Sequence, residues 1–243
     1  MSRFYESISQ HKGFAVLVDP DKQDKHQLEL LLKSFAESAP DVILVGGSLV
    51  FHPVDDTIKF LKKHTDIPVY LFPGDATQLS DHADGIFFLS LISGRNPEFL
   101  IGNHVVAAPH LRRSGIDVIP VGYMLIENGH STSVEYVSNT RPIPFGKTDL
   151  AVATAMAGEM LGLRMIYLEA GSGAAKTVGI DMIAAIRKSV GLPLVVGGGI
   201  RTIQDAENVY NAGADLIVIG TQIETFPGQI GEFAALRNRL NGI

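Results

Sequence analysis

The chain has 243 residues, of which 46% are apolar and 19% charged, and it contains 25 glycines, no cysteine and a formal net charge of −6. This length suits one large α/β domain or two small ones, and the lack of cysteine excludes a disulfide framework and a cysteine metal site. The net negative charge, with Lys and Arg scattered along the chain, argues against a nucleic-acid partner.

No window of the sequence reaches the ~18 uninterrupted apolar residues of a membrane-spanning helix. The first six residues, MSRFYE, lack the apolar stretch of a signal peptide. We therefore expect a soluble, cytoplasmic protein. No domain boundary or linker is evident in the sequence, so we also expect a single domain over residues 1–243.

Eight short apolar runs, rich in Val and Ile, recur along the whole chain. They lack the alternation of a half-exposed strand, which is typical of a parallel sheet covered on both faces. In chain order the predicted strands are Phe14–Asp19, Val42–Gly46, Val69–Phe72, Gly85–Leu89, Val118–Tyr123, Met165–Glu169, Leu194–Gly197 and Leu216–Gly220.

Most of these runs are followed by an amphipathic segment. The first, Asp24–Ser38, places Leu28, Leu31, Leu32 and Phe35 on one helical face, with Asp24 as candidate N-cap. Alternation of strand and helix, at close to the usual barrel length of ~250 residues, predicts a closed (β/α)₈ TIM barrel rather than an open doubly wound sheet. The other predicted helices are Thr148–Gly162, Asp181–Gly191, Thr202–Gly213 and Phe226–Leu240.

One outer helix is predicted to be short or missing. An Asp directly before one of the predicted strands recurs at Asp41, Asp84 and Asp215, at the expected starts of strands 2, 4 and 8. Four units between Asp84 and Asp215 span 131 residues, whereas the two units between Asp41 and Asp84 share only 43. Only the brief segment Asp75–Ser80 is available for the third helix, so a side gap should expose the apolar wall of the barrel.

The segment Glu127–Lys147, after the fifth strand, is polar and shows no helical period. Loops that follow barrel strands form the active face. The segment is therefore either a loop that covers the substrate or a plain surface excursion.

Six glycines form three groups directly after the last three strands, at Gly171–Gly173, Gly197–Gly199 and Gly220–Thr221. Glycine lets backbone N–H groups approach an anion closely, and helix N-termini add positive partial charge. We predict that these glycines form a phosphate site. The alternative is that they only allow tight turns. Neither a Walker A loop nor a Gly-x-Gly-x-x-Gly fingerprint is present.

Asp19 ends the first strand, at the expected mouth of the barrel. A lone carboxylate there is a base, a substrate anchor or a metal ligand, unless it only stabilises the turn. Magnesium needs one or two protein ligands when substrate phosphates complete its shell, and Ser48, just past the second strand, offers a neighbouring oxygen.

Tyr167 and Glu169 are alternate residues at the end of the sixth strand, so both should point inward. A carboxylate at that place can accept a hydrogen bond from a substrate hydroxyl or take its proton. The alternative is that Glu169 only caps a helix. The histidines form no zinc motif.

Six motifs together resemble the geranylgeranylglyceryl phosphate synthase family, which includes the PcrB-type heptaprenylglyceryl phosphate synthases. The resemblance covers essentially the whole chain, and the segment YLEAGSG is its most specific part. The motifs are Leu17–Lys22, Gly46–Ser48, Ser93–Glu98, Tyr167–Gly173, Val196–Arg201 and Gly220–Thr221.

The resemblance implies a magnesium-dependent prenyltransferase of ether phospholipid biosynthesis. It would join the 3-hydroxyl of sn-glycerol 1-phosphate to a polyprenyl diphosphate, such as geranylgeranyl diphosphate, and release pyrophosphate. At the matching motif positions, Asp19 and Ser48 would hold Mg²⁺. Beyond the resemblance, we hypothesise that Lys22 contacts the diphosphate and that Glu169 orients the glycerol hydroxyl and accepts its proton. Glycerol phosphate would be bound by Tyr167, Leu168, Glu169, Ala170, Gly171, Ser172, Gly173, Gly198, Gly199, Gly220 and Thr221.

Three further expectations accompany this function. The prenyl chain should lie along the wall exposed by the missing third helix, because each buried methylene contributes ~0.8 kcal/mol. The resemblance implies a homo-oligomer, a dimer or a hexamer. A lipid substrate and product also imply transient contact with a membrane surface.

Two other functions are compatible with the sequence. One is a phosphate-binding barrel enzyme of the isomerase type that acts on a soluble phosphorylated metabolite. The other is a non-enzymatic binder of a prenyl phosphate or a phospholipid. The first predicts no apolar groove, and the second predicts binding without turnover.

Overall fold

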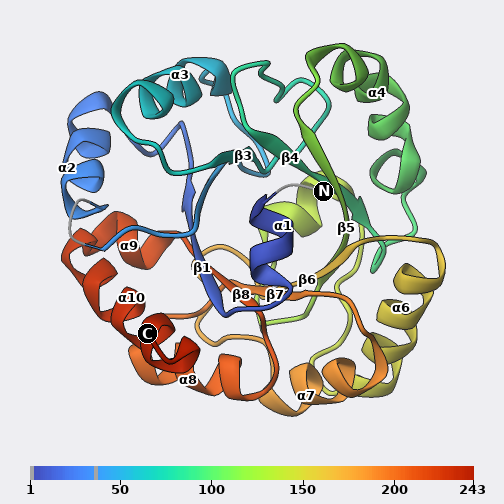
Figure 1. Ribbon diagram of the computed structural model, residues 1–243. Helices are drawn as coiled ribbons and strands as arrows, with labels where there is room; N and C mark the ends of the chain where they lie inside the picture. The colour runs from blue at the N-terminus through green and yellow to red at the C-terminus, as the bar shows by residue number, and fades with distance from the viewer. Residues whose placement is uncertain (1–2, 36–37) are drawn as a thin grey trace.

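The computed structural model describes residues 3–35 and 38–243, and its strands form one closed, fully parallel barrel in chain order (Figure 1). This confirms the predicted TIM barrel. The strands are β1 (Gly13–Val18), β2 (Val42–Val45), β3 (Val69–Leu71), β4 (Gly85–Leu91), β5 (Asp117–Leu125), β6 (Met165–Glu169), β7 (Leu194–Gly197) and β8 (Leu216–Ile219).

Helices form a ring around the barrel (Figure 1). Those matching predicted segments are α2 (Lys25–Phe35), α6 (Thr148–Met160), α7 (Ile180–Ser189), α8 (Ile203–Asn211) and α10 (Ile230–Asn241). The structure adds α1 (Arg3–Ile8), α3 (Val54–His64), α4 (Asn103–Ser114), α5 (Ser133–Ser138) and α9 (Thr221–Thr225). It also adds the short π-helix η1 (Glu98–Gly102) and the 3₁₀ helix η2 (Pro227–Gln229).

The boundaries of α2 show what sequence periodicity determined and what it did not. Asp24 caps the helix as predicted, since its Oδ1 accepts the backbone N–H of Gln27 at 2.8 Å. Leu28, Leu31 and Phe35 are buried. The described part of the helix runs to Phe35, and Ser38 is not helical. Residues 36 and 37 of the predicted segment, like residues 1 and 2, lie outside the described residues.

Two of the added helices differ in how clearly the sequence indicates them. In α3, Val54, Ile58 and Leu61 are buried at helical spacing, so its period was readable. In α4, Val105 and Val106 are exposed, and this outward apolar pair hides the helical period.

The recurring aspartates precede their strands as predicted, and each one ties two strands together at the base of the barrel. Asp41 accepts the N–H of Phe14 on β1 at 2.8 Å, and Asp84 accepts that of Val69 on β3 at 2.8 Å. Asp215 does the same for Leu194 on β7, at 2.9 Å. Each carboxylate also pairs with a cation, namely Arg237 for Asp41, Lys62 for Asp84, and Lys12 and Arg187 for Asp215.

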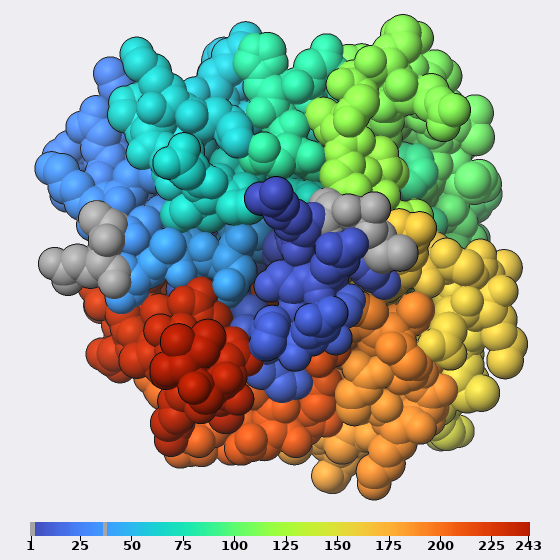
Figure 2. Space-filling model, viewed as in Figure 1, coloured from blue at the N-terminus to red at the C-terminus, as the bar shows by residue number. Residues whose placement is uncertain are grey.

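The core has two layers, one between strands and helices and one inside the barrel. Helix α1 closes the end of the barrel seen in Figures 1 and 2, where its side chains fill the centre of the face. Phe4 of α1 packs on Tyr70, with ring centroids 5.1 Å apart, and lies 6.2 Å from Phe87. The site must therefore open at the opposite end, where the strands terminate.

The connection from β3 to β4, residues 72–84, contains no helix, and all of its residues are described. Figure 1 shows this linker passing between α3 and α4. The predicted loss of the third outer helix is therefore confirmed. Among the residues that the structure describes, no helix is long and apolar enough to cross a membrane.

Candidate active site

A cavity of about 520 Å³ lies at the carboxyl ends of the strands. We call it the polar cavity because charged side chains, among them Asp19, Lys22 and Glu169, line it. Its lining draws on the turns after β1, β2, β6, β7 and β8, so residues far apart in the sequence meet there. Of the predicted site residues, it includes Asp19, Lys22, Ser48, Tyr167, Glu169, Ser172, Gly173, Gly198, Gly199, Gly220 and Thr221.

The remaining predicted residues are placed differently. The side chains of Leu168 and Ala170 belong to the layer between strands and helices. Gly171 directs its N–H to Glu169. Alternation along β6 therefore sends Tyr167 and Glu169 into the barrel, as predicted, and Leu168 away from it.

The turn after β7 requires glycine at two positions. Gly198 has φ +78° and Gly199 has φ +70°, a conformation that other residues rarely adopt. A Cβ on Gly199 would lie 2.2 Å from the carbonyl oxygen of Lys176. Arg201, just after this turn, lines the cavity and donates to the carbonyl oxygen of Gly173 at 3.2 Å, which joins the turns after β6 and β7.

Glu169 is a buried carboxylic acid, with 7% of its surface exposed. Burial raises its pKa to about 7. The Gly171 N–H and the neighbouring Tyr167 hydroxyl have the opposite effect and lower this pKa, but burial outweighs them. The Gly171 N–H donates to Oε1 at 2.6 Å, whereas the Tyr167 hydroxyl faces the carboxylate without reaching hydrogen-bond geometry. An acid with a pKa near neutrality, open to a cavity, is suited to proton transfer.

Asp19 has the turn-stabilising role considered for it, and it also forms an ion pair. Its Oδ1 accepts the N–H of Asp21 at 3.1 Å, so it stabilises the turn, and its Oδ2 forms an ion pair with Lys22 Nζ at 3.0 Å. The carboxylate also faces the cavity, next to Gly47. Ser48 follows Gly47 and lines the same cavity.

Glu224, on α9, is a second carboxylate at this end of the cavity. Burial raises its pKa, an effect that the charge of Asp19 reinforces and that Lys22 and the backbone N–H of Asp19 oppose. Among the described residues, however, no three acidic or histidine side chains are grouped so that they would hold a metal ion. A cation here would depend on oxygens from a bound substrate.

Asp21 holds the turn after β1 against the loop after β2. Its carboxylate accepts the backbone N–H groups of His52 and Phe51, at 2.8 Å each. These backbone hydrogen bonds lower the pKa of Asp21. The two loops that carry Asp19 and Ser48 are therefore tied together.

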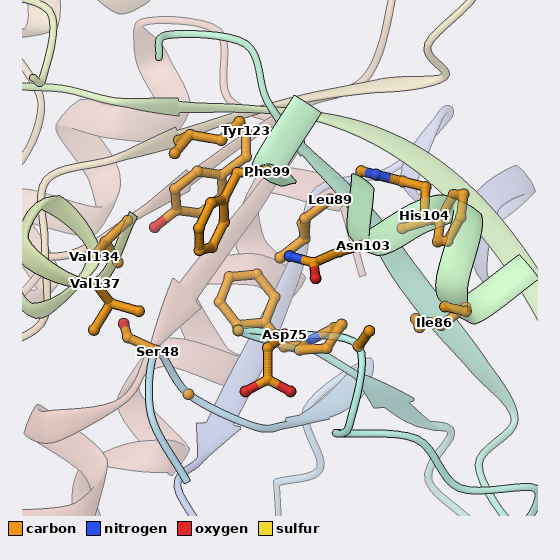
Figure 3. A pocket seen from close by; sticks show the side chains of 18 of the residues that line it. Ser48, Asp75, Ile86, Leu89, Phe99, Asn103, His104, Tyr123, Val134 and Val137 are labelled. Carbon is orange, nitrogen blue, oxygen red and sulfur yellow. The ribbon is translucent and has the colours of Figure 1, made fainter. Parts of the chain in front are cut away.

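A second, mainly apolar groove begins at Ser48 and runs beneath η1 and α4 (Figure 3). In this view Ser48, Val134 and Val137 lie at one end, and His104 and Ile86 at the other. Burial lowers the pKa of His104, despite a contact with the Leu89 carbonyl that raises it, so the far end holds a neutral imidazole. The groove occupies the gap left by the missing helix, and its linker side comprises Phe72, Pro73, Gly74, Asp75, Ala76 and Leu79.

The polar cavity and the apolar groove share part of their walls. Gly47, Ser48, Phe72, Tyr123 and Val134 line both. The Tyr123 ring stacks on Tyr167 at 5.3 Å between centroids, and Phe72 lies 5.3 Å from Tyr167. A molecule that spans both spaces would place its middle against these aromatic rings.

The segment 127–147 is not wholly irregular, because Ser133–Ser138 forms the short helix α5. The lack of a helical period in this segment therefore did not exclude a short helix. The Thr132 side chain caps α5 by accepting the Glu135 N–H at 3.1 Å, over too few residues to show a period. Val134 and Val137 of α5 line the groove, which favours the covering loop over a surface excursion.

Sequence reasoning missed Phe72, Tyr123 and Val134, although they line both spaces. Aromatic residues in strands are ordinary core residues, and no spacing signal distinguishes these. Arg201 had a local signal, since it comes two residues after the last glycine of the turn after β7.

Comparison with known proteins gives a consistent result. The family model described as the PcrB family matches residues 6–235. A protein of Spirosoma linguale named geranylgeranylglyceryl phosphate synthase is 46% identical over 235 residues, which cover 96% of this chain and 94% of the relative. A protein of the same name from Flavobacterium johnsoniae is 50% identical over 214 residues, 88% of each chain.

A solved structure is similar over nearly the whole molecule. It is (S)-3-O-geranylgeranylglyceryl phosphate synthase from Thermoplasma acidophilum in complex with its substrate sn-glycerol-1-phosphate. It has a TM-score of 0.90 and 30% sequence identity, over 99% of this chain and 97% of that one. The chain therefore belongs to the PcrB family.

Proposed function

We propose that this protein is a prenyltransferase of ether lipid biosynthesis, which joins the 3-hydroxyl of sn-glycerol 1-phosphate to a polyprenyl diphosphate and releases pyrophosphate. The named relatives and the substrate complex of the similar structure support this activity. The names of the relatives favour a geranylgeranyl donor. We take residues 1–243 to act as one functional domain.

The observation that carries the proposal is the shared wall between the polar cavity and the apolar groove. A soluble phosphorylated metabolite would need only the cavity. A prenyl diphosphate has a charged head and a long hydrocarbon tail, and it needs both spaces in continuity. Burial of that tail contributes ~0.8 kcal/mol for each methylene.

In the proposed reaction, the bond between the first prenyl carbon and the diphosphate oxygen breaks, and its electron pair leaves with pyrophosphate. The glycerol 3-oxygen forms the new C–O bond, and its proton passes to the carboxylate of Glu169. The rings of Phe72 and Tyr123 lie where the two spaces meet, so their π faces can stabilise positive charge on the reacting carbon. Lys22 lines the cavity, and we assign it a contact with the diphosphate.

Asp19 and Ser48 fit a magnesium ion completed by substrate phosphates. Both line the cavity beside Gly47, and they offer the oxygen ligands that Mg²⁺ prefers. A bound Mg²⁺ would neutralise charge on the departing pyrophosphate. We assign glycerol phosphate to the glycine turns after β6, β7 and β8, on the far side of Glu169 from the groove.

Incubation with labelled sn-glycerol 1-phosphate, Mg²⁺ and prenyl diphosphates of several lengths tests the function. Transfer of the prenyl group is the expected result. Binding of both ligands without turnover would indicate a carrier instead. Indifference to every prenyl diphosphate would indicate an enzyme of a soluble phosphorylated metabolite.

We also propose that the protein works in the cytoplasm and contacts the membrane surface transiently. Exposed apolar side chains support this contact, since Leu49 and Phe51 follow β2, Tyr136 lies on α5 and Phe226 follows α9. Co-sedimentation with lipid vesicles tests it. The proposed homo-oligomer, a dimer or a hexamer, is tested by light scattering.

A further inference from the structure

We infer that Gln78 is a positioning residue, which holds Ser48 at the boundary between the polar cavity and the apolar groove. This inference rests on the proposed function. Gln78 lies in the linker between β3 and β4 and lines neither space, so it acts through the backbone that it holds.

Gln78 is 4% exposed, and its side-chain amide forms hydrogen bonds with the backbone of two glycines. Its Nε2 donates to the Gly47 carbonyl oxygen at 3.0 Å. Its Oε1 accepts the N–H of Gly74 at 3.1 Å and that of Gly47 at 3.4 Å. One amide thus binds both sides of the Gly47 backbone, immediately before Ser48.

Close backbone packing reinforces this connection. A Cβ on Gly74 would lie 2.3 Å from the carbonyl oxygen of Gly47 and 2.7 Å from that of Ser48. The linker is therefore pressed directly against the loop after β2, with no room for a side chain between them. Gly47 in turn lies beside the Asp19 carboxylate.

The linker thus has two effects that a regular outer helix would not combine. Through Asp75, Ala76 and Leu79 it lines the groove for the hydrocarbon tail. Through Gln78 it fixes the loop that presents Ser48 to the diphosphate end of the same substrate. Loss of the Gln78 amide should leave the tail site intact but let the Ser48 loop move relative to Asp19.

Calorimetric binding of a non-reactive prenyl thiolodiphosphate, with and without Mg²⁺, tests this inference in the variant Gln78→Met. Methionine has a similar length but makes none of the three hydrogen bonds. We expect about tenfold weaker binding in the presence of Mg²⁺, the size expected for losing buried hydrogen bonds. Binding of sn-glycerol 1-phosphate, on the opposite side of the cavity, should not change.

Ser80→Ala is the matched control. Ser80 belongs to the same linker and is 4% exposed, but its hydroxyl donates to Asp55 Oδ1 on α3, at 2.6 Å. This variant should lose thermal stability and keep the Mg²⁺-dependent affinity for the analogue. Gly74→Ala, which displaces Gly47 and Ser48, should reproduce the effect of Gln78→Met and serves if that variant does not fold.

Wild-type affinity for the analogue in both Gln78→Met and Gly74→Ala would overturn the positioning role, and so would equal weakening in Ser80→Ala. Failure of the proposed function would look different. In that case the wild-type protein itself would not bind the analogue, with or without Mg²⁺.

Discussion

The carboxylate of Glu169 accepts the backbone N–H of Gly171 at 2.6 Å, two residues further along the chain. This bond closes the turn at the end of β6 and aims the carboxylate into the cavity. It opposes, but does not cancel, the effect of burial, which raises the pKa of Glu169 to about 7. The hydrogen bond that orients this carboxylate therefore also affects its pKa.

The stability of the protein should depend on pH through Glu169. The folded-state pKa of about 7 exceeds the ordinary value of 4.5, so ionisation is harder in the folded state. The free energy of unfolding should therefore decrease as pH rises from about 4.5 to about 7, by up to roughly 3 kcal/mol. The side chain of Glu169→Gln cannot ionise, so this variant should not lose stability in this way. Denaturant unfolding at several pH values should therefore show its free energy of unfolding increasing relative to that of wild type between pH about 4.5 and about 7. A constant difference between the two proteins would contradict the assignment.

Glu169→Gln should also lower turnover by about 10²-fold or more, because a positioned proton acceptor contributes about 10²–10⁴. The KM for sn-glycerol 1-phosphate should change little, since glutamine keeps the acceptor for Gly171. In the wild-type enzyme, kcat/KM should rise with pH and level off above about 7. Steady-state kinetics of both proteins provide the measurement, and near-normal turnover of the variant would exclude the role of base.

Asp19→Ala should reduce activity by about 10²-fold and raise the Mg²⁺ concentration needed for half-maximal rate, because a metal ligand is lost. Removal of Mg²⁺ with a chelator should abolish wild-type activity, and added Mg²⁺ should restore it. Asp24→Ala is the control. It removes the cap of α2 at a cost of about 1 kcal/mol in stability and should leave the Mg²⁺ dependence unchanged.

Ala76→Phe should shorten the prenyl chain that the enzyme accepts, because Ala76 lines the groove and a larger side chain would occupy it. Rates with prenyl diphosphates of increasing length measure the effect. Thr77→Phe is the comparison, since Thr77 is the adjacent residue and is exposed outside the groove. An unchanged length profile in Ala76→Phe would place the tail elsewhere.

Gly198→Ala should raise the KM for sn-glycerol 1-phosphate by at least about tenfold, the equivalent of ~1.4 kcal/mol of binding. Its φ is +78°, and a Cβ would lie 2.5 Å from Glu169 Oε1 and 2.8 Å from the Gly171 nitrogen. Gly162→Ala controls for backbone strain alone, since Gly162 has φ +84° and open space around it. A similar KM in the two variants would remove the turn after β7 from the phosphate site.

Much of the architecture was predictable because it depends on local patterns. Strands buried on both faces must be continuously apolar, so the eight runs identified the barrel strands. The spacing from Asp41 to Asp84 predicted the missing helix, because a crossover helix needs residues that this interval lacks. Helix α4 escaped prediction because Val105 and Val106 point outward, and α5 because six residues are too few to show a period.

The features of the site also fall into those that the sequence predicts and those that depend on the tertiary structure. By itself the sequence determined that Asp19, Glu169 and the glycine turns come at strand ends, which a parallel barrel brings to one face. Only the tertiary structure decided that Phe72 and Tyr123 lie where a polar cavity meets an apolar groove, that burial shifts the pKa of Glu169, and that Gln78 holds the loop of Ser48. These properties arise from contacts between residues distant in the chain, and hydrophobic periodicity carries no information about which side chains meet across a barrel.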